Sequence, residues 1–96
     1  METLFVIYDE AFQEEISAII ERDMVVPRYS RLDGVIGARM AQREEQSGYL
    51  TDRRNRMIVL VAESATIARI VRNLSDLRAR KGHGLRAFVV PTTEVI

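Results

Sequence analysis

The chain has 96 residues, of which 47% are hydrophobic and 29% are charged, a composition typical of one globular domain rather than of a disordered chain. Its 14 basic and 14 acidic side chains cancel, so no overall charge favours nucleic acid or an anionic membrane. The absence of cysteine excludes disulfides, thiolate metal sites and a cysteine nucleophile.

The first predicted element is a buried strand over residues 3–8. Its β-branched and aromatic residues follow one another without a break, in a run too short for a helix. Asp9 can cap a helix that begins directly afterwards. The apolar side chains of this helix recur at the spacing of one helical face, and they are Phe12, Ile16, Ile19 and Ile20. We therefore expect the helix to pack on the strand.

The next segment is less regular. Pro27 cannot lie inside a helix, so the chain must leave the helical state near Met24. A second strand is predicted from Tyr29 to Val35, where apolar residues recur within a polar stretch. Residues 38–55 are polar with little periodicity, and we expect them to form a long exposed loop, with a short helix over 38–46 as the alternative.

The second half of the chain repeats the pattern of the first. An unbroken apolar strand is predicted over 57–62, followed by a helix that Ser64 can cap and that ends at Lys81 before Gly82. Its apolar face comprises Ile67, Ile70, Val71, Leu74 and Leu77. A last strand over 85–90 is closed by Pro91.

The predicted order is strand, helix, strand, strand, helix, strand over one domain, residues 1–96. Right-handed crossovers in two such halves give the ferredoxin-like βαββαβ fold of the α+β class, an antiparallel sheet with both helices on one face. The strands are apolar on both sides, so the other sheet face needs a cover, most simply another copy of the chain. No signal peptide or membrane-spanning stretch is evident, and we expect a cytoplasmic protein.

A glycine corner after the second predicted helix is the first candidate site. Gly82 and Gly84 stand one residue apart, with Lys81 and Arg86 beside them. Such a corner frees backbone N–H groups and can hold a phosphate or another small anion. The alternative is a glycine stop of the helix followed by an ordinary turn.

A second glycine pair, Gly34 and Gly37, precedes the predicted loop. Glycine there lets the backbone bend sharply or approach a ligand closely. The pair does not match the glycine fingerprint of dinucleotide-binding folds, which opens a helix after a strand. A simple bend is the alternative.

Catalysis, metal binding and nucleic-acid binding have little support. His83 is the only histidine, and an exposed turn histidine is more frequent than three copies that bind zinc or copper on a trimer axis. No acid–base pair or serine triad appears at motif spacing, so we expect no enzyme. The arginine cluster at 53–56 lacks the stacking aromatics of nucleic-acid-binding strands.

These features together resemble the PII-like signalling proteins, and in particular the short PII-like proteins encoded beside heavy-metal efflux pumps. The resemblance covers nearly the whole chain and is most specific over residues 81–91, whereas 37–55 match only in being a loop. The family has a lysine directly after the second glycine, where this chain has Leu85 and then Arg86.

The resemblance implies a homotrimer with the sheets lining a central core and the helices outside. It also implies clefts between subunits that sense a small anionic ligand, with an adenine nucleotide as the cofactor, and a loop that contacts a partner protein such as a membrane transporter. The candidate ligand-binding residues are Gly34, Gly37, Arg39, Lys81, Gly82, His83, Gly84 and Arg86.

Two other interpretations share the fold. One is a CutA-type divalent-cation tolerance protein, which is also trimeric and would respond to metal. The other is a small enzyme of the dimeric ferredoxin-like barrel group. That enzyme needs a polar residue in an apolar cleft, for which Tyr8, Tyr29 and His83 are available.

Overall fold

The computed structural model describes residues 1–25, 28–36 and 54–96. Within these residues the order of elements is the one that the sequence predicts. The elements are β1 (Glu2–Asp9), a 3-10 turn η1 (Glu10–Phe12), α1 (Gln13–Asp23), β2 (Ser30–Ile36), β3 (Arg54–Ala62), α2 (Ser64–Lys81) and β4 (Leu85–Pro91).

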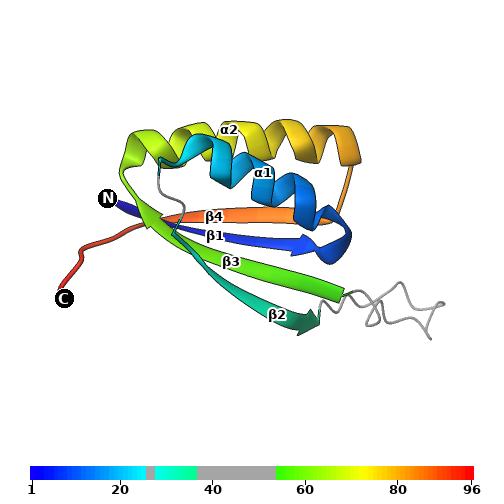
Figure 1. The fold of residues 1–96 in the computed structure, drawn as a ribbon, viewed down its shortest axis with the longest axis horizontal. Coiled ribbons are helices and arrows are strands. Elements are labelled where there is room, and N and C mark those ends of the chain that lie inside the picture. Colours follow the sequence, from blue (N-terminus) through cyan, green and yellow to red (C-terminus); the bar gives the residue numbers. More distant parts are fainter. Residues whose placement is uncertain (26–27, 37–53) are drawn as a thin grey trace, which may run out of the picture.

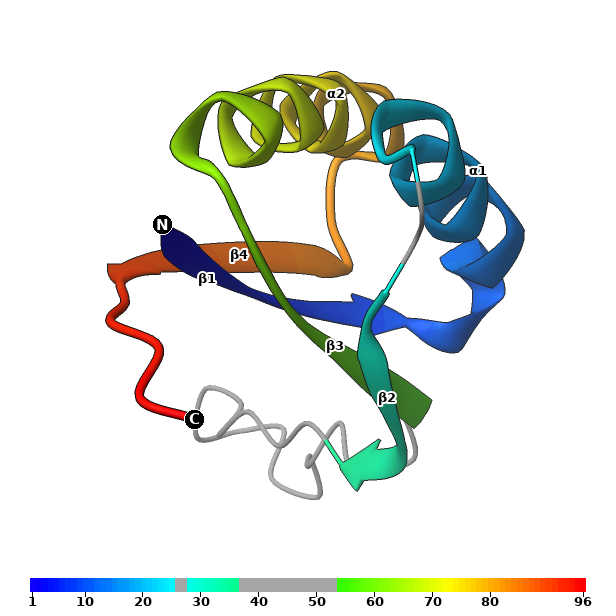
Figure 2. The same cartoon turned by 60° about the vertical axis from the view of Figure 1, so that its left-hand side comes forward.

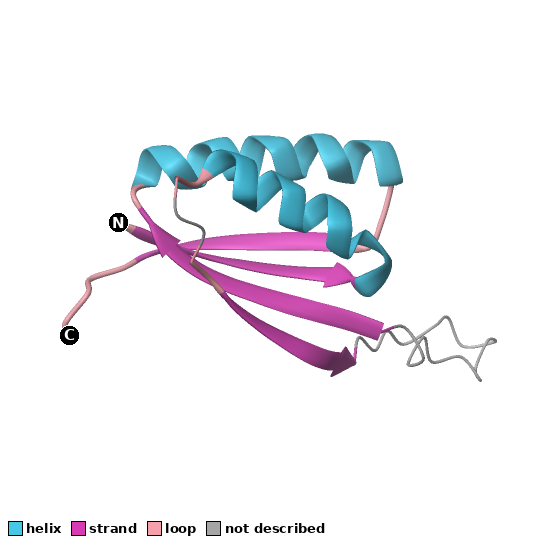
Figure 3. Cartoon of the chain, viewed as in Figure 1, coloured by secondary structure: helices cyan, strands magenta, loops and turns pink. Residues whose placement is uncertain are grey.

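The four described strands form one sheet in the order β2-β3-β1-β4, and each neighbouring pair is antiparallel. Both helices lie on the same face of this sheet, which makes two layers (Figures 1 and 3). Seen nearly along the sheet, the helix layer covers only one side (Figure 2). The predicted ferredoxin-like α+β fold is therefore confirmed.

The core lies between the sheet and the helices. Alternate residues of β1, among them Leu4 and Val6, face the helices and are fully buried, opposite Leu60 and Ile58 of β3. The helices contribute the faces that the sequence predicts, comprising Phe12, Ile16, Ile19, Ile20, Ile67, Ile70, Leu74 and Leu77. The 3.6-residue period of these positions explains why both helices settle flat on the sheet.

The opposite face of the sheet is apolar and uncovered within the described residues. Phe5 lies between Val59 and Phe88 in the strand register, and the side chain positions on either side continue the pattern. We call this surface the open sheet face, and it consists of Phe5, Ile7, Leu32, Met57, Val59, Val61, Phe88 and Val90. Phe88 is 46% exposed and Val61 is 44% exposed, so large apolar side chains meet solvent here.

Two local predictions are corrected. Arg54 and Asn55 belong to β3, where they pair with Ile36 and Val35, because backbone pairing extends the strand regardless of side-chain polarity. The N-cap of α2 is Glu63, without a side-chain capping bond, and Ser64 is the first helical residue. The predicted loop at 38–53 lies outside the described residues. No helix among the described residues is long and apolar enough to cross a membrane.

Candidate functional site

The glycine corner after α2 has the backbone conformation that only glycine adopts readily. Gly82 has a φ of 82° and Gly84 a φ of 79°. The N–H of Gly82 donates to the Arg78 carbonyl at 2.7 Å and closes the helix, as predicted. The carbonyl of Gly84 accepts a 2.9 Å bond from the N–H of Asp9. The corner is thus fixed to the end of β1.

The corner also packs tightly on the η1 turn. A Cβ atom placed on Gly84 would lie 2.8 Å from Cε2 of Phe12, closer than real Cβ contacts come. The ring of His83 lies 6.2 Å from the Phe12 ring between centroids, tilted by 41°. His83 therefore contributes to the packing of the corner on Phe12.

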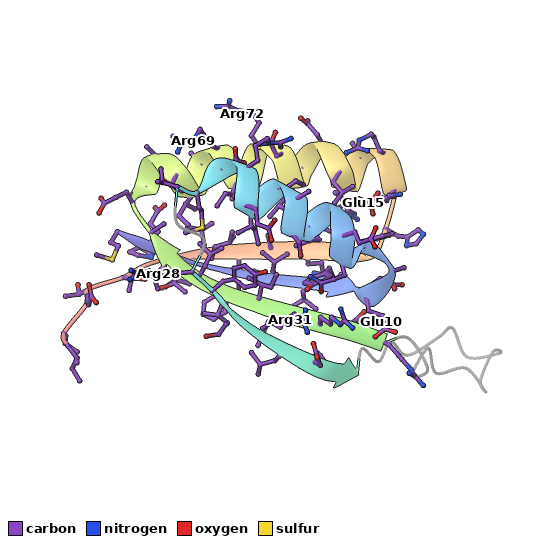
Figure 4. All side chains as sticks on the ribbon, in the orientation of Figure 1. Glu10, Glu15, Arg28, Arg31, Arg69 and Arg72 are labelled. Carbon is purple, nitrogen blue, oxygen red and sulfur yellow. The ribbon has the colours of Figure 1, made fainter. Side chains whose placement is uncertain are left out.

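Lys81 faces the helix layer. Its Nζ lies 3.0 Å from Oε2 of Glu15 on α1 and 5.4 Å from the centroid of the Phe12 ring. Glu15 projects from the α1 side of the molecule in Figure 4. The carboxylate of Glu15 therefore already neutralises the cation that the sequence places beside the corner.

Arg86 lies on the other side of the sheet. It pairs with Ile7 in the register, next to buried Leu85, so its side chain is on the open sheet face. Its guanidinium carbon is 5.4 Å from the ring centroid of Phe88. Within the described residues Arg86 forms no ion pair. Lys81 and Arg86 flank the corner in sequence, but the structure does not bring them together.

Gly34 lies at the far edge of the same sheet. It has a φ of 73° and sits where the β2 register shifts between Leu32 and Val35. A Cβ placed there would meet no atom within 4 Å, so the positive φ is the only constraint. Since β3 and β1 separate β2 from β4, Gly34 and the corner form no common pocket in one chain. Gly37 and Arg39 lie outside the described residues.

A polar network that the sequence analysis missed lies under the helix layer, where β1, β3 and α1 meet. Its centre is the amide of Gln13, whose Oε1 accepts bonds from the Tyr8 hydroxyl and, at 3.0 Å, from Nη1 of Arg56. Nε2 of Gln13 donates to Ser17 at 2.6 Å. Burial raises the pKa of Tyr8 above its usual value, against the opposing effect of nearby Arg31 and Arg56.

Acidic side chains surround Arg56 in this network. Its Nε lies 3.4 Å from Oδ1 of Asp33 and 4.0 Å from Oε2 of Glu10. Arg31 shares the Asp33 carboxylate at 2.9 Å. Arg31 and Glu10 are both labelled near this end of the sheet in Figure 4. The strand register opposes Arg56 to Tyr8, a signal hidden because the sequence pattern of residues 53–56 is typical of the end of a loop.

Comparison with known proteins was made by sequence and by structure. No protein-family model matches the chain, and no curated protein matches it in sequence. Solved structures do match it in fold. CPII from Thiomonas intermedia K12, described as a nitrogen regulatory PII-like protein, superposes with a TM-score of 0.71 at 16% identity over 92% of this chain and 84% of its own.

Two further structures agree. A PII-like signalling protein from Thermus thermophilus gives a TM-score of 0.64 at 12% identity, covering 92% of this chain and 82% of its own. A DUF3240 family protein from Shewanella baltica gives a TM-score of 0.68 at 14% identity, covering 98% of this chain and 91% of its own. The chain therefore has the fold of PII-like signalling proteins, which confirms the fold that the sequence resemblance implies.

Proposed function

We propose that the chain is a trimeric PII-like signalling protein that binds a small anionic ligand, of the adenine-nucleotide class, in clefts between subunits. The observation that carries the proposal is the position of Arg86. This cation lies on the open sheet face beside the fixed glycine corner, where a second subunit that covers the face would complete a cleft. The Gly34 end of that neighbour would supply the other wall.

The open sheet face supports assembly. Its apolar side chains cannot be covered by the two described helices, because both lie on the opposite face. A contiguous apolar surface of this kind favours association, since a small domain gains stability by sharing it. Three copies with their sheets inward would cover all three faces at once.

The structural neighbours support the class of ligand. Structures of CPII hold ADP and AMP together with acetate or bicarbonate. We take these molecules as the ligands to test. We propose a regulatory rather than a catalytic role, in which residues 38–55 contact a partner protein such as a transporter.

Titration calorimetry with ADP, AMP and bicarbonate tests this function. We expect wild-type protein to bind an adenine nucleotide. Arg86→Ala should weaken binding by about 1.5 to 3 kcal/mol, the usual worth of a hydrogen bond to a charged group. Arg72→Ala is the matched control, because Arg72 projects from α2 away from the sheet (Figure 4). Nucleotide binding that is equally strong in Arg86→Ala and wild type would contradict the site.

A further inference from the structure

A groove of about 440 Å³ runs along the outer edge of β4, beside α2. β4 is an edge strand of the described sheet, with β1 as its one neighbour. The residues that line the groove are Val71, Leu74, Ser75, Arg78, Leu85, Arg86, Ala87 and Phe88. The groove thus joins the side of a helix to the edge of a strand.

The backbone of β4 offers hydrogen-bonding groups to this groove. Gly84 and Thr92, at the two ends of β4, are each bonded to the β1 side, through Asp9 and Met1. Bonded positions alternate in an antiparallel pair, so the residues between them at odd positions turn the other way. The N–H and C=O groups of Leu85, Ala87 and Val89 therefore point to the free edge, in the donor and acceptor pattern of an added strand.

The two edges of the sheet differ in how they are protected. The β2 edge is interrupted by the register shift between Leu32 and Val35. Such a bulge disturbs the backbone pattern that another strand needs. The register of β4 on β1 runs without a shift from Leu85 to Pro91. β4 is therefore the edge that can accept a further strand.

The side chains around this edge define the chemistry of an occupant. Val71, Leu74 and Leu85 supply apolar surface, and Arg78 and Arg86 supply positive charge. Within the described residues neither arginine forms an ion pair. An extended segment with alternating apolar and acidic residues would match both features.

We propose that the β4 edge binds an extended acidic segment of a partner protein, which adds as a fifth strand and places its carboxylates by Arg78 and Arg86. A second copy fits this edge less well, because symmetric pairing of two β4 edges would bring the arginines of both copies together. The inference goes beyond the proposed function and does not depend on nucleotide binding. Arg78 and Ala87 belong to no part of the proposed ligand cleft.

The test uses a fluorescently labelled, end-blocked peptide of alternating valine and glutamate, about seven residues long to match a typical strand, in anisotropy titrations. A valine–lysine peptide of the same length is the charge control. We expect the acidic peptide to bind and the basic one not to. Ala87→Pro removes a free-edge N–H and leaves the pairing with β1 intact, so it should weaken binding at least about tenfold.

Arg78→Glu should also weaken binding at least about tenfold, because it reverses the charge that attracts the peptide, while Arg72→Glu, on the same helix but away from the groove, should leave it unchanged. No binding to wild type at millimolar peptide, or binding that ignores both Ala87→Pro and Arg78→Glu, would overturn the proposal. So would pyrophosphate competing for Arg78 with no effect of Ala87→Pro, which indicates a small-anion site. Self-association that Ala87→Pro abolishes would make a second copy the occupant instead.

Discussion

Gly84 is constrained both by its conformation and by its neighbour. Its φ of 79° disfavours any side chain, and Phe12 leaves no room for a Cβ. Gly84→Ala should therefore lower the free energy of unfolding by about 2 to 5 kcal/mol, the sum of left-handed strain and overpacking. Gly34→Ala is the matched control with strain alone, at about 1 to 2 kcal/mol. Urea denaturation would contradict the packing account if the two variants lost equal stability.

Tyr8 should make stability depend on pH at the alkaline end. Because burial raises its pKa in the folded state, the unfolded chain loses this proton first as the pH rises above about 10. The stabilisation is complete below that pH and declines as the pH approaches the folded pKa. Tyr8→Phe should cost about 1 kcal/mol at pH 7, through the lost bond to Gln13.

Urea denaturation of both proteins from neutral pH to about one unit above the ordinary tyrosine pKa checks this prediction. The stability difference between wild type and Tyr8→Phe should shrink once the pH exceeds that ordinary value. A difference that stays constant over the whole range would show that Tyr8 titrates alike in the folded and unfolded chains.

At the level of single residues the sequence predicts backbone better than side-chain company. The glycine corner was predicted because helix ends favour glycine, and both Gly82 and Gly84 confirm it with positive φ. The separation of Lys81 from Arg86 was not predicted, because alternation along β4 and the ion pair with Glu15 depend on tertiary packing. The proposed roles of Gly34 and Arg86 toward a ligand stay predictions.

Among the elements, the junction of β1 with α1 depends on Asp9. Its side chain accepts a 2.9 Å bond from the N–H of Ala11 in η1, and its own N–H reaches Gly84. Asp9→Ala should cost about 0.5 to 2 kcal/mol, as cap losses do, and Asp9→Asn should retain most of that stability. Thermal unfolding of the two variants separates capping from charge, and an equal loss in both would contradict the capping role.

The strands and helices were predictable where side chains alone decide them. Continuous apolar runs marked β1 and β3, and the 3.6-residue period marked the buried faces of α1 and α2. The errors fall at ends. β3 starts at polar Arg54 because backbone pairing carries it on, and the network around Gln13 joins elements far apart in sequence. Neither follows from local pattern.

At the scale of the whole molecule, the two faces of the sheet have different roles. Ile58 is fully buried beneath the helices, whereas its neighbour Val59 lies on the open sheet face opposite Phe5. The sequence predicted that face because the strands are apolar on both sides. How many copies cover it is a property of the assembly, which we propose to be a trimer.

This adjacent pair separates folding from assembly. Ile58→Asp should unfold the chain, since an unpaired buried charge costs several kcal/mol. Val59→Asp should instead leave a folded monomer, because its charge meets solvent once the subunits separate. Circular dichroism distinguishes the two outcomes. A Val59→Asp protein that remains assembled would exclude the open sheet face from the interface.

Sedimentation equilibrium of the wild-type protein at micromolar concentration is the most direct test of the trimer. The account predicts a mass of about 33 kDa, three times the 11.0 kDa of one chain. A folded wild-type species at the mass of one chain, with the open sheet face bare, would contradict it.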